Sequence, residues 1–189
     1  MIVLAYLMGS IPVGVFLAKI RGIDPRKTGS GNIGATNVMR SAGKAIGAVT
    51  LLCDIAKGYI PVSLALYMGE WEYVVAMTGF AVFLGHLFPV FLKFRGGKGV
   101  ATALGVYIAL GPLAVLTAFV LFVIVFAVWR YVSLASLTGA LAVPVTLYIM
   151  GAPYEFVIMG ALITVFIIIR HKDNILRLAS GTENKLSFK

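Results

Sequence analysis

Charged residues are scarce in this sequence of 189 residues: 12% are Asp, Glu, Lys or Arg, whereas 60% are hydrophobic. A water-soluble domain carries about a quarter charged residues, because its surface must be covered with groups that water solvates. The scarcity of charge excludes a soluble globular protein and predicts an integral membrane protein. We expect one membrane domain over residues 1–189, without a soluble domain at either end.

Cysteine is also nearly absent, since Cys53 is the only one, and a lone cysteine excludes an intrachain disulfide. The few His, Asp and Glu residues lack the spacing of a metal site, and the Gly-x-Ser-x-Gly elbow of serine hydrolases is missing. We therefore expect no metal ion and no cofactor. The N-terminal MIVLAYLMGS has no basic residue before its apolar part and no Ala-x-Ala site, so it predicts a retained helix rather than a signal peptide.

The hydrophobic residues form six long runs. These are Ile2–Ile20, Ala45–Met68, Val74–Leu92, Val100–Val128, Leu134–Met150 and Phe156–Ile169. A membrane-spanning helix needs about 20 apolar residues, or fewer inside a bundle, so five of the runs predict one helix each. The fourth run is too long for one ordinary span and has Gly111-Pro112, a strong turn signal, in its middle.

Acidic residues are the rarer charged type, with 7 Asp and Glu against 16 Lys and Arg. The basic residues concentrate in three segments, Arg21–Ala45, Lys93–Gly99 and 170–189, whereas the segments Glu70–Glu72 and Gly151–Glu155 hold only acids. The positive-inside rule places the basic segments in the cytoplasm and the acidic segments outside.

The same rule decides how often the fourth run crosses the membrane. Lys93–Gly99 and Arg130 are both cytoplasmic only if this run crosses twice. We therefore predict an all-α integral membrane protein, a bundle of seven transmembrane helices with the N-terminus outside and the C-terminus cytoplasmic. The alternative has six helices, with the fourth run as one kinked helix and the basic tail outside.

A polar stretch, RKTGSGNIGATNVMR at Arg26–Arg40, contains neither a carboxylate nor an aromatic residue. Gly29, Gly31 and Gly34 match G-x-G-x-x-G, but no strand precedes them and Asp24-Pro25 breaks the chain upstream, which argues against a dinucleotide site. Glycines nevertheless let backbone N–H groups approach an anion closely. Neutral donors come from Ser30, Asn32, Thr36 and Asn37, and Arg40 supplies a guanidinium fork.

A second stretch, LKFRGGKGVAT, repeats this pattern, with Gly96, Gly97 and Gly99 around Lys98 just before the next expected helix. Two such loops on one side of the membrane predict ligands that carry phosphate. The alternative is that the glycines serve turns and close helix contacts, which are common in membrane bundles.

Ionisable residues also fall inside or at the ends of the apolar runs. Asp54 and Lys57 lie three residues apart on one helix face, which favours an internal ion pair, with Lys57 reaching toward the cytoplasmic loops as the alternative. His86 is more typical of a packing residue than of a catalyst. His171 and Asn174 are again three residues apart, so a helix there places both on one face at the membrane surface.

Together these motifs resemble the PlsY family of bacterial integral-membrane glycerol-3-phosphate acyltransferases, the acyl-phosphate-dependent type. The resemblance covers nearly the whole chain. It rests on GSIPVG (Gly9–Gly14), SGNIGATNVMR (Ser30–Arg40), GHLFPVFLKFRGGKGVAT (Gly85–Thr102), YVSLAS (Tyr131–Ser136), and RHKDNILRL with GTENK (Arg170–Lys185).

The resemblance implies a seven-helix bundle in the bacterial inner membrane with its active site facing the cytoplasm. It implies transfer of an acyl group from acyl phosphate to the 1-hydroxyl of glycerol 3-phosphate, giving 1-acyl-glycerol 3-phosphate (lysophosphatidic acid) and phosphate. The partners would be these two substrates and membrane lipid, with no nucleic acid. Neither acyl-CoA nor acyl carrier protein would be a direct donor.

The resemblance also implies the site residues. The expected catalytic residues are Ser30, Arg40, Lys98, His171 and Asn174, with Lys98 in a loop that binds glycerol 3-phosphate. The expected substrate contacts are Gly31, Asn32, Gly34, Thr36, Asn37, Gly96, Gly97, Gly99, Ser133 and Ser136.

Two mechanisms remain open for the proton of the attacking hydroxyl. A phosphate oxygen of the donor is one acceptor, with Lys98, Arg40 and backbone N–H groups stabilising the leaving charge; His171 as general base is the other. An acyl-enzyme on Ser30 is less favoured, because no neighbouring base is visible. The alternative function is an organic-phosphate transporter, although the sequence has no convincing internal repeat.

Overall fold

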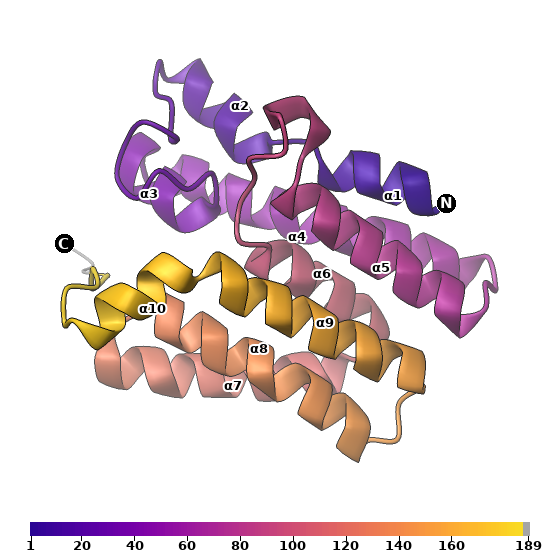
Figure 1. Ribbon diagram of the computed structural model, residues 1–189. Coiled ribbons are helices and arrows are strands. Elements are labelled where there is room, and N and C mark those ends of the chain that lie inside the picture. The colour runs from indigo at the N-terminus through magenta and orange to yellow at the C-terminus, as the bar shows by residue number, and fades with distance from the viewer. Residues whose placement is uncertain (187–189) are drawn as a thin grey trace. The chain divides into compact units, whose positions relative to one another are not determined.

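The computed structural model describes residues 1–186 as helices joined by turns, with no strand among those residues (Figure 1). The chain divides into two compact units, one from Met1 to Leu110 and one that begins at Gly111. The first unit contains α1 (Ile2–Gly9), α2 (Val13–Ile20), α3 (Ala35–Ala42), α4 (Lys44–Tyr67), α5 (Glu72–Leu87), the short 3-10 helix η1 (Val90–Leu92) and α6 (Val100–Leu110). The second contains α7 (Pro112–Trp129), α8 (Val132–Ile149), α9 (Tyr154–Arg170) and α10 (Lys172–Ala179). Lys189 of the basic tail lies outside the described residues.

Several of these segments are long and apolar enough to cross a membrane. They are Ile2–Ile20, Lys44–Tyr67, Glu72–Leu92, Pro112–Trp129 and Val132–Ile149. A sixth is added if α9 and α10, which meet at a bend of 60°, count as one span. Helix α6 is apolar but has only 11 residues, or about 16 Å at 1.5 Å per residue, against roughly 30 Å of hydrocarbon. The all-helical membrane architecture is confirmed, while the count of seven stays a prediction.

Proline marks two breaks in the apolar runs. The turn predicted in the fourth run is confirmed, since α6 ends at Leu110 and α7 begins with Pro112 at its first position, where proline's fixed φ suits a helix. The first run differs from the single helix that we expected, because it is interrupted between Gly9 and Val13. Pro12 lacks an N–H group and disfavours helical geometry at the residue before it, which separates α1 from α2.

Helix α4 is the centre of the first unit, because α2, α3, α5 and α6 all pack against it. A Cβ atom added to Gly58 on α4 would overlap the carbonyl oxygen of Thr102 on α6. A Cβ atom added to Gly85 on α5 would likewise overlap the carbonyl oxygen of Tyr6 on α1. Glycine therefore allows the backbones of these helices to touch, as small residues do in membrane bundles.

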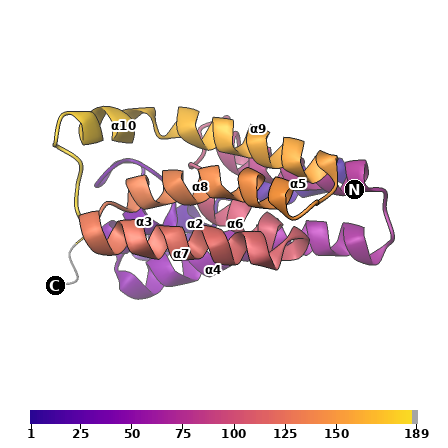
Figure 2. The same ribbon diagram turned by 90° about the horizontal axis from the view of Figure 1, so that it is seen from below.

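Helix α8 lies between α7 and α9 in the second unit and packs against both (Figure 2). The hydroxyl of Thr164 on α9 donates a hydrogen bond to the carbonyl oxygen of Ala140 on α8 at 2.8 Å. Helix α7 buries only Ala114 and exposes large apolar side chains such as Leu116 and Phe119. A helix that is apolar on nearly every face suits contact with lipid.

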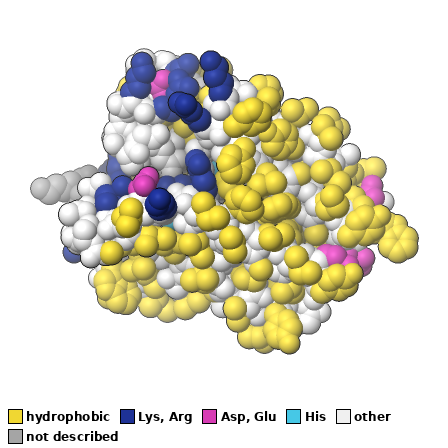
Figure 3. All heavy atoms as spheres, viewed as in Figure 1, with side chains coloured by type: hydrophobic (Ala, Val, Ile, Leu, Met, Phe, Trp, Pro, Cys, Tyr) yellow, Lys and Arg dark blue, Asp and Glu magenta, His cyan; other side chains and the backbone are white. Residues whose placement is uncertain are grey.

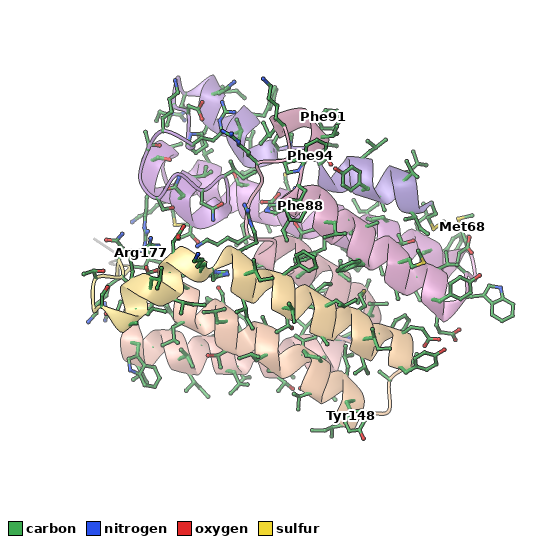
Figure 4. All side chains as sticks on the ribbon, in the orientation of Figure 1. Met68, Phe88, Phe91, Phe94, Tyr148 and Arg177 are labelled. Atoms are coloured by element: carbon green, nitrogen blue, oxygen red, sulfur yellow. The ribbon has the colours of Figure 1, made fainter. Side chains whose placement is uncertain are left out.

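Charge is segregated in the first unit. Lys and Arg side chains gather at the end that carries α2 and α3, with Asp24 paired to Arg26 among them, whereas Glu70 and Glu72 lie at the turn from α4 to α5 (Figure 3). Phe91 and Phe94 project from the turn after α5 (Figure 4) and are 60% and 58% exposed.

Candidate active site

The first polar loop, between α2 and α3, folds around the buried side chain of Asn37. Its amide nitrogen Nδ2 donates to the carbonyl oxygens of Pro25 (2.8 Å), Thr28 (3.1 Å) and Asn32 (2.8 Å). Its Oδ1 accepts the backbone N–H of Ser30 at 2.8 Å. An asparagine amide has two N–H donors and one acceptor oxygen, and here all of them bond to the backbone of this loop.

Asp24, the carboxylate nearest to this loop in the sequence, is already paired. Arg26 donates two hydrogen bonds to its carboxylate, from Nε to Oδ1 (2.9 Å) and from Nη2 to Oδ2 (2.6 Å). The hydrogen bonds from Arg26 hold the pKa of Asp24 well below its ordinary value. Asp24 therefore stays ionised, with its negative charge balanced by Arg26. The other basic side chains of the loop keep their positive field.

The other predicted residues of this loop lie nearer to its surface. Ser30, Gly31 and Arg40 are exposed, and Asn32, Gly34 and Thr36 are half-buried. Arg40 belongs to the last turn of α3. Its side chain is thus open to solvent at the end of this helix.

The second polar loop folds back onto the end of α5. The N–H of Gly96 donates to the carbonyl oxygen of Leu87, and the N–H of Gly97 donates to that of His86, each at 3.1 Å. Both carbonyls lie in the last turn of α5, where no intrahelical partner is left for them. The loop therefore caps the helix that precedes it.

Glycine is required at the end of this loop. Gly99 has φ of +81°, and an added Cβ atom would collide with the ring of Phe83, so a side chain at this position is excluded on both grounds. Lys98 is half-buried immediately before it, and α6 begins at Val100. The ammonium charge of Lys98 thus adds to the positive end of the α6 dipole.

Several backbone N–H groups that we expected to face an anion are bonded within the protein instead. The N–H groups of Ser30, Gly31, Gly34, Gly96 and Gly97 each donate to an oxygen atom of the protein rather than facing a ligand. An unpaired backbone N–H away from water costs about as much as a lost hydrogen bond, so a loop that is folded before its ligand arrives pairs these groups internally. The side-chain cations, rather than these amides, are then the main source of positive charge in the two loops.

The third polar region lies in the second unit, where α9 meets α10. His171 is 3% exposed at this junction, and its Nδ1 lies 2.8 Å from the carbonyl oxygen of Ile167. A carbonyl oxygen only accepts, so Nδ1 carries the hydrogen and the lone pair of the neutral ring is on Nε2. The fold thereby selects one tautomer of the histidine.

Glu183 organises the rest of this region. Its Oε1 accepts hydrogen bonds from the hydroxyl of Ser133 (2.7 Å) and the amide of Asn174 (2.6 Å), and its Oε2 accepts one from Nε of Arg177 (2.7 Å), a residue of α10 (Figure 4). Burial raises the pKa of this carboxyl group, but the three hydrogen bonds outweigh that effect, so the pKa of Glu183 is lowered. The ionised carboxylate holds α8, α10 and the tail together.

Glu183 was not among the predicted site residues. It belongs to the quoted GTENK motif, but no spacing rule links it to Ser133, 50 residues upstream. A carboxylate within a basic tail was the one available signal. Ser136, one turn along α8 from Ser133, is also buried. Among residues 1–186, no group of three or more His, Cys, Asp or Glu side chains is placed to hold a metal ion.

Known proteins of one family are similar to this chain along nearly its whole length. A family model described as glycerol-3-phosphate acyltransferase matches residues 1–181. The chain is 52% identical over 184 residues to the glycerol-3-phosphate acyltransferase of Geotalea daltonii, covering 97% of this chain and 95% of the relative. It is 44% identical over 186 residues to that of Aquifex aeolicus, covering 98% and 97%.

Two solved structures are also similar to this chain. Both are crystal structures of PlsY, described as an integral membrane glycerol 3-phosphate acyltransferase, one in a glycerol 3-phosphate form and one in a lysophosphatidic acid form. Each is 43% identical to this chain and covers 98% of it, with 94% and 93% of the other chain matched and TM-scores of 0.96 and 0.93.

Proposed function

Because the chain belongs to the glycerol-3-phosphate acyltransferase family, we propose that it transfers an acyl group from acyl phosphate to the 1-hydroxyl of glycerol 3-phosphate. The products are then 1-acyl-glycerol 3-phosphate and inorganic phosphate, and neither acyl-CoA nor acyl carrier protein donates directly. The observation that carries this proposal is the match over 98% of the chain to a protein solved in a glycerol 3-phosphate form and a lysophosphatidic acid form.

The two substrates are both phosphorylated, and the cations of the polar loops supply the complementary charge. Lys98, at the start of α6, binds the phosphate of glycerol 3-phosphate. Arg40, with the exposed hydroxyl of Ser30 nearby in the sequence, binds the acyl phosphate and stabilises the phosphate that leaves. Fixed cations aimed at a developing charge lower a barrier without reorganising, and this supports the assignment of both residues.

The reaction needs an acceptor for one proton. As the 1-hydroxyl oxygen bonds to the acyl carbon and the bond from that carbon to the phosphate oxygen breaks, the departing phosphate takes the hydroxyl proton. Glu183 is already engaged by three donors, and Asp24 is paired with Arg26, which supports the substrate phosphate over either carboxylate. His171, whose neutral ring has its lone pair on Nε2, is the competing acceptor.

The membrane arrangement is part of the proposal. The protein forms one domain of seven transmembrane helices in the bacterial inner membrane, with the N-terminus outside and the active site facing the cytoplasm. The basic loops at one end of the first unit and the acidic turn at its other end support this orientation.

The function is tested with purified protein in detergent micelles, which have no sealed compartment. Acyl phosphate and glycerol 3-phosphate together should give equimolar phosphate and 1-acyl-glycerol 3-phosphate, identified by mass spectrometry. Acyl-CoA in place of acyl phosphate should give no product. If no product forms in micelles but vesicles containing the protein take up glycerol 3-phosphate, the protein is a transporter.

A further inference from the structure

Three ionisable side chains meet inside the first unit: Asp54 and Lys57 on α4, and His86 on α5. They are 3%, 6% and 4% exposed. Nζ of Lys57 lies 2.8 Å from Oδ1 of Asp54, which confirms the predicted ion pair, and it also donates to the carbonyl oxygen of Ile11 at 3.1 Å. Nδ1 of His86 lies 3.6 Å from the same Asp54 oxygen, a charge contact slightly longer than a hydrogen bond.

The cluster connects three segments of the first unit. The carbonyl of Ile11 lies in the break between α1 and α2, where it accepts the N–H of Val13 as well as the Lys57 ammonium, each at 3.1 Å. Ionisable residues within membrane segments are costly and usually have a functional reason. The ion pair alone balances the charge of Asp54, so it does not explain why a histidine is placed beside it.

The other ring nitrogen of His86, Nε2, and its backbone carbonyl both face the second polar loop. A Cβ atom built on Gly97 would overlap Nε2 of the imidazole and lie 3.1 Å from both Cδ2 and Cε1, so the Nε2 end of the ring points at the side of Gly97 where a side chain would lie. The carbonyl oxygen of His86 also accepts the N–H of Gly97. One residue therefore holds Gly97 through its backbone and its side chain, and Gly97 directly precedes Lys98.

We propose that His86 is a positioning residue for Lys98. Asp54 lies beside Nδ1 of the imidazole, the Nε2 end of the imidazole and the His86 carbonyl hold Gly97, and Gly97 determines where the Lys98 ammonium meets the phosphate of glycerol 3-phosphate. This rests on the proposed function, in which Lys98 binds that phosphate. A loop that is no longer held should bind glycerol 3-phosphate weakly, whereas binding of the acyl donor at Arg40 should be unaffected.

The test is the variant His86→Asn, measured in micelles by steady-state kinetics for both substrates. Asparagine keeps a polar group beside Asp54 but is too short to place an atom where Nε2 meets Gly97. The KM for glycerol 3-phosphate should rise about tenfold, with kcat and the KM for acyl phosphate within about twofold. An unchanged KM for glycerol 3-phosphate, or an equal rise in both KM values, would overturn the proposal.

Thr78→Ala is the matched control. Thr78 lies on the same helix, is fully buried, and has a hydroxyl without a hydrogen-bond partner among the described residues. Its truncation perturbs the interior of α5 without touching the loop, so both KM values should stay within about twofold. If Thr78→Ala raises the KM for glycerol 3-phosphate as much as His86→Asn does, general loosening of α5 explains the effect and the proposal fails.

Lys98→Ala separates this inference from the proposed function. If Lys98→Ala leaves the KM for glycerol 3-phosphate unchanged, the assignment of Lys98 fails and the role of His86 fails with it. If Lys98→Ala raises that KM and His86→Asn does not, only the role of His86 is lost. When both variants raise the KM for glycerol 3-phosphate, the double variant should have the same KM as Lys98→Ala alone, because the two residues then act through one contact. A double variant whose KM rises by the product of the two single effects would contradict the proposal.

A second variant covers the case in which His86→Asn does not fold. His86→Leu fills a similar volume but has no atom in the place of Nε2, so it should raise the KM for glycerol 3-phosphate at least threefold. Size-exclusion chromatography and thermal unfolding establish that each variant is folded before its kinetics are compared. A folded His86→Leu with the KM of the unaltered protein would exclude the positioning role.

Discussion

Asn37 and Arg40 lie one turn apart on α3, yet their side chains have different surroundings. The Asn37 amide is buried and bonded to four backbone groups of its own loop, whereas the Arg40 side chain is exposed. A buried polar group whose hydrogen bonds are satisfied within the protein has none left for a ligand. At the residue scale, Asn37 is thus the internal support of the loop, whereas Arg40 remains open to solvent.

Replacing Asn37 with alanine should open this loop. The change leaves three carbonyl groups and one N–H without their partner, each at a cost of about 1 kcal/mol or more where water does not replace it. We expect kcat/KM to fall more than tenfold and trypsin to cleave after Arg26 or Lys27 at least tenfold faster. Ser41→Ala, which removes a hydroxyl bonded to the Asn37 carbonyl oxygen, is the control and should leave the cleavage rate nearly unchanged.

The variant His171→Gln separates the two proton acceptors. If phosphate accepts the proton, glutamine should retain a few per cent of kcat, because its amide substitutes in part for the imidazole. A general base is worth up to about 10⁴-fold in rate, so a loss of that size in His171→Gln would identify His171 as the base. Lys172→Gln, at the next and exposed position, should retain kcat within about twofold.

The helices in the middle of the chain follow the apolar runs closely. The run Ala45–Met68 was expected as one helix, and α4 covers Lys44–Tyr67; the run Leu134–Met150 corresponds to α8 in the same way. Helix α3, in contrast, lies within a segment that we expected to be only a polar loop. Apolar runs locate helices that lipid surrounds, but a short amphipathic helix is stabilised by packing on a neighbour, here α4.

Glu183 should make the attachment of α10 dependent on pH. A carboxyl group whose pKa is lowered by folding stabilises the protein above the pKa of the unfolded chain, near 4.5, and this stability is lost as the pH falls through the folded pKa. We expect Glu183→Gln to lower the Tm at pH 7, because the neutral amide cannot accept from all three donors. The difference in Tm from the unaltered protein should narrow below pH 4.5.

Asp173→Asn provides the comparison for that experiment. Asp173 is an exposed carboxylate on α10. Surface charges of this kind contribute little to stability. Its Tm should follow that of the unaltered protein at every pH. A Glu183→Gln curve that runs parallel to the unaltered protein down to pH 3 would contradict the role given to the Glu183 carboxylate.

At the scale of the whole molecule, the distribution of charge predicts on which side of the membrane each segment lies. The acidic turn between α4 and α5 and the basic tail after α10 are predicted to lie on opposite sides of the membrane. In a Cys53→Ala background, Glu72→Cys should react with an impermeant maleimide in intact cells. Lys185→Cys should react only after the cells are permeabilised, and labelling of both in intact cells would favour the six-helix arrangement.

The sequence alone was sufficient for the membrane class, the turn at Gly111, the internal pair of Asp54 and Lys57, and the family, because each depends on composition or on residues close together in the chain. The tertiary structure decided which polar groups are already engaged. Glu183 meets Ser133 from 50 residues away, and His86 meets Gly97 across the turn after α5. Hydrogen-bond partners are selected by distance in space, and no local pattern of residues specifies that distance.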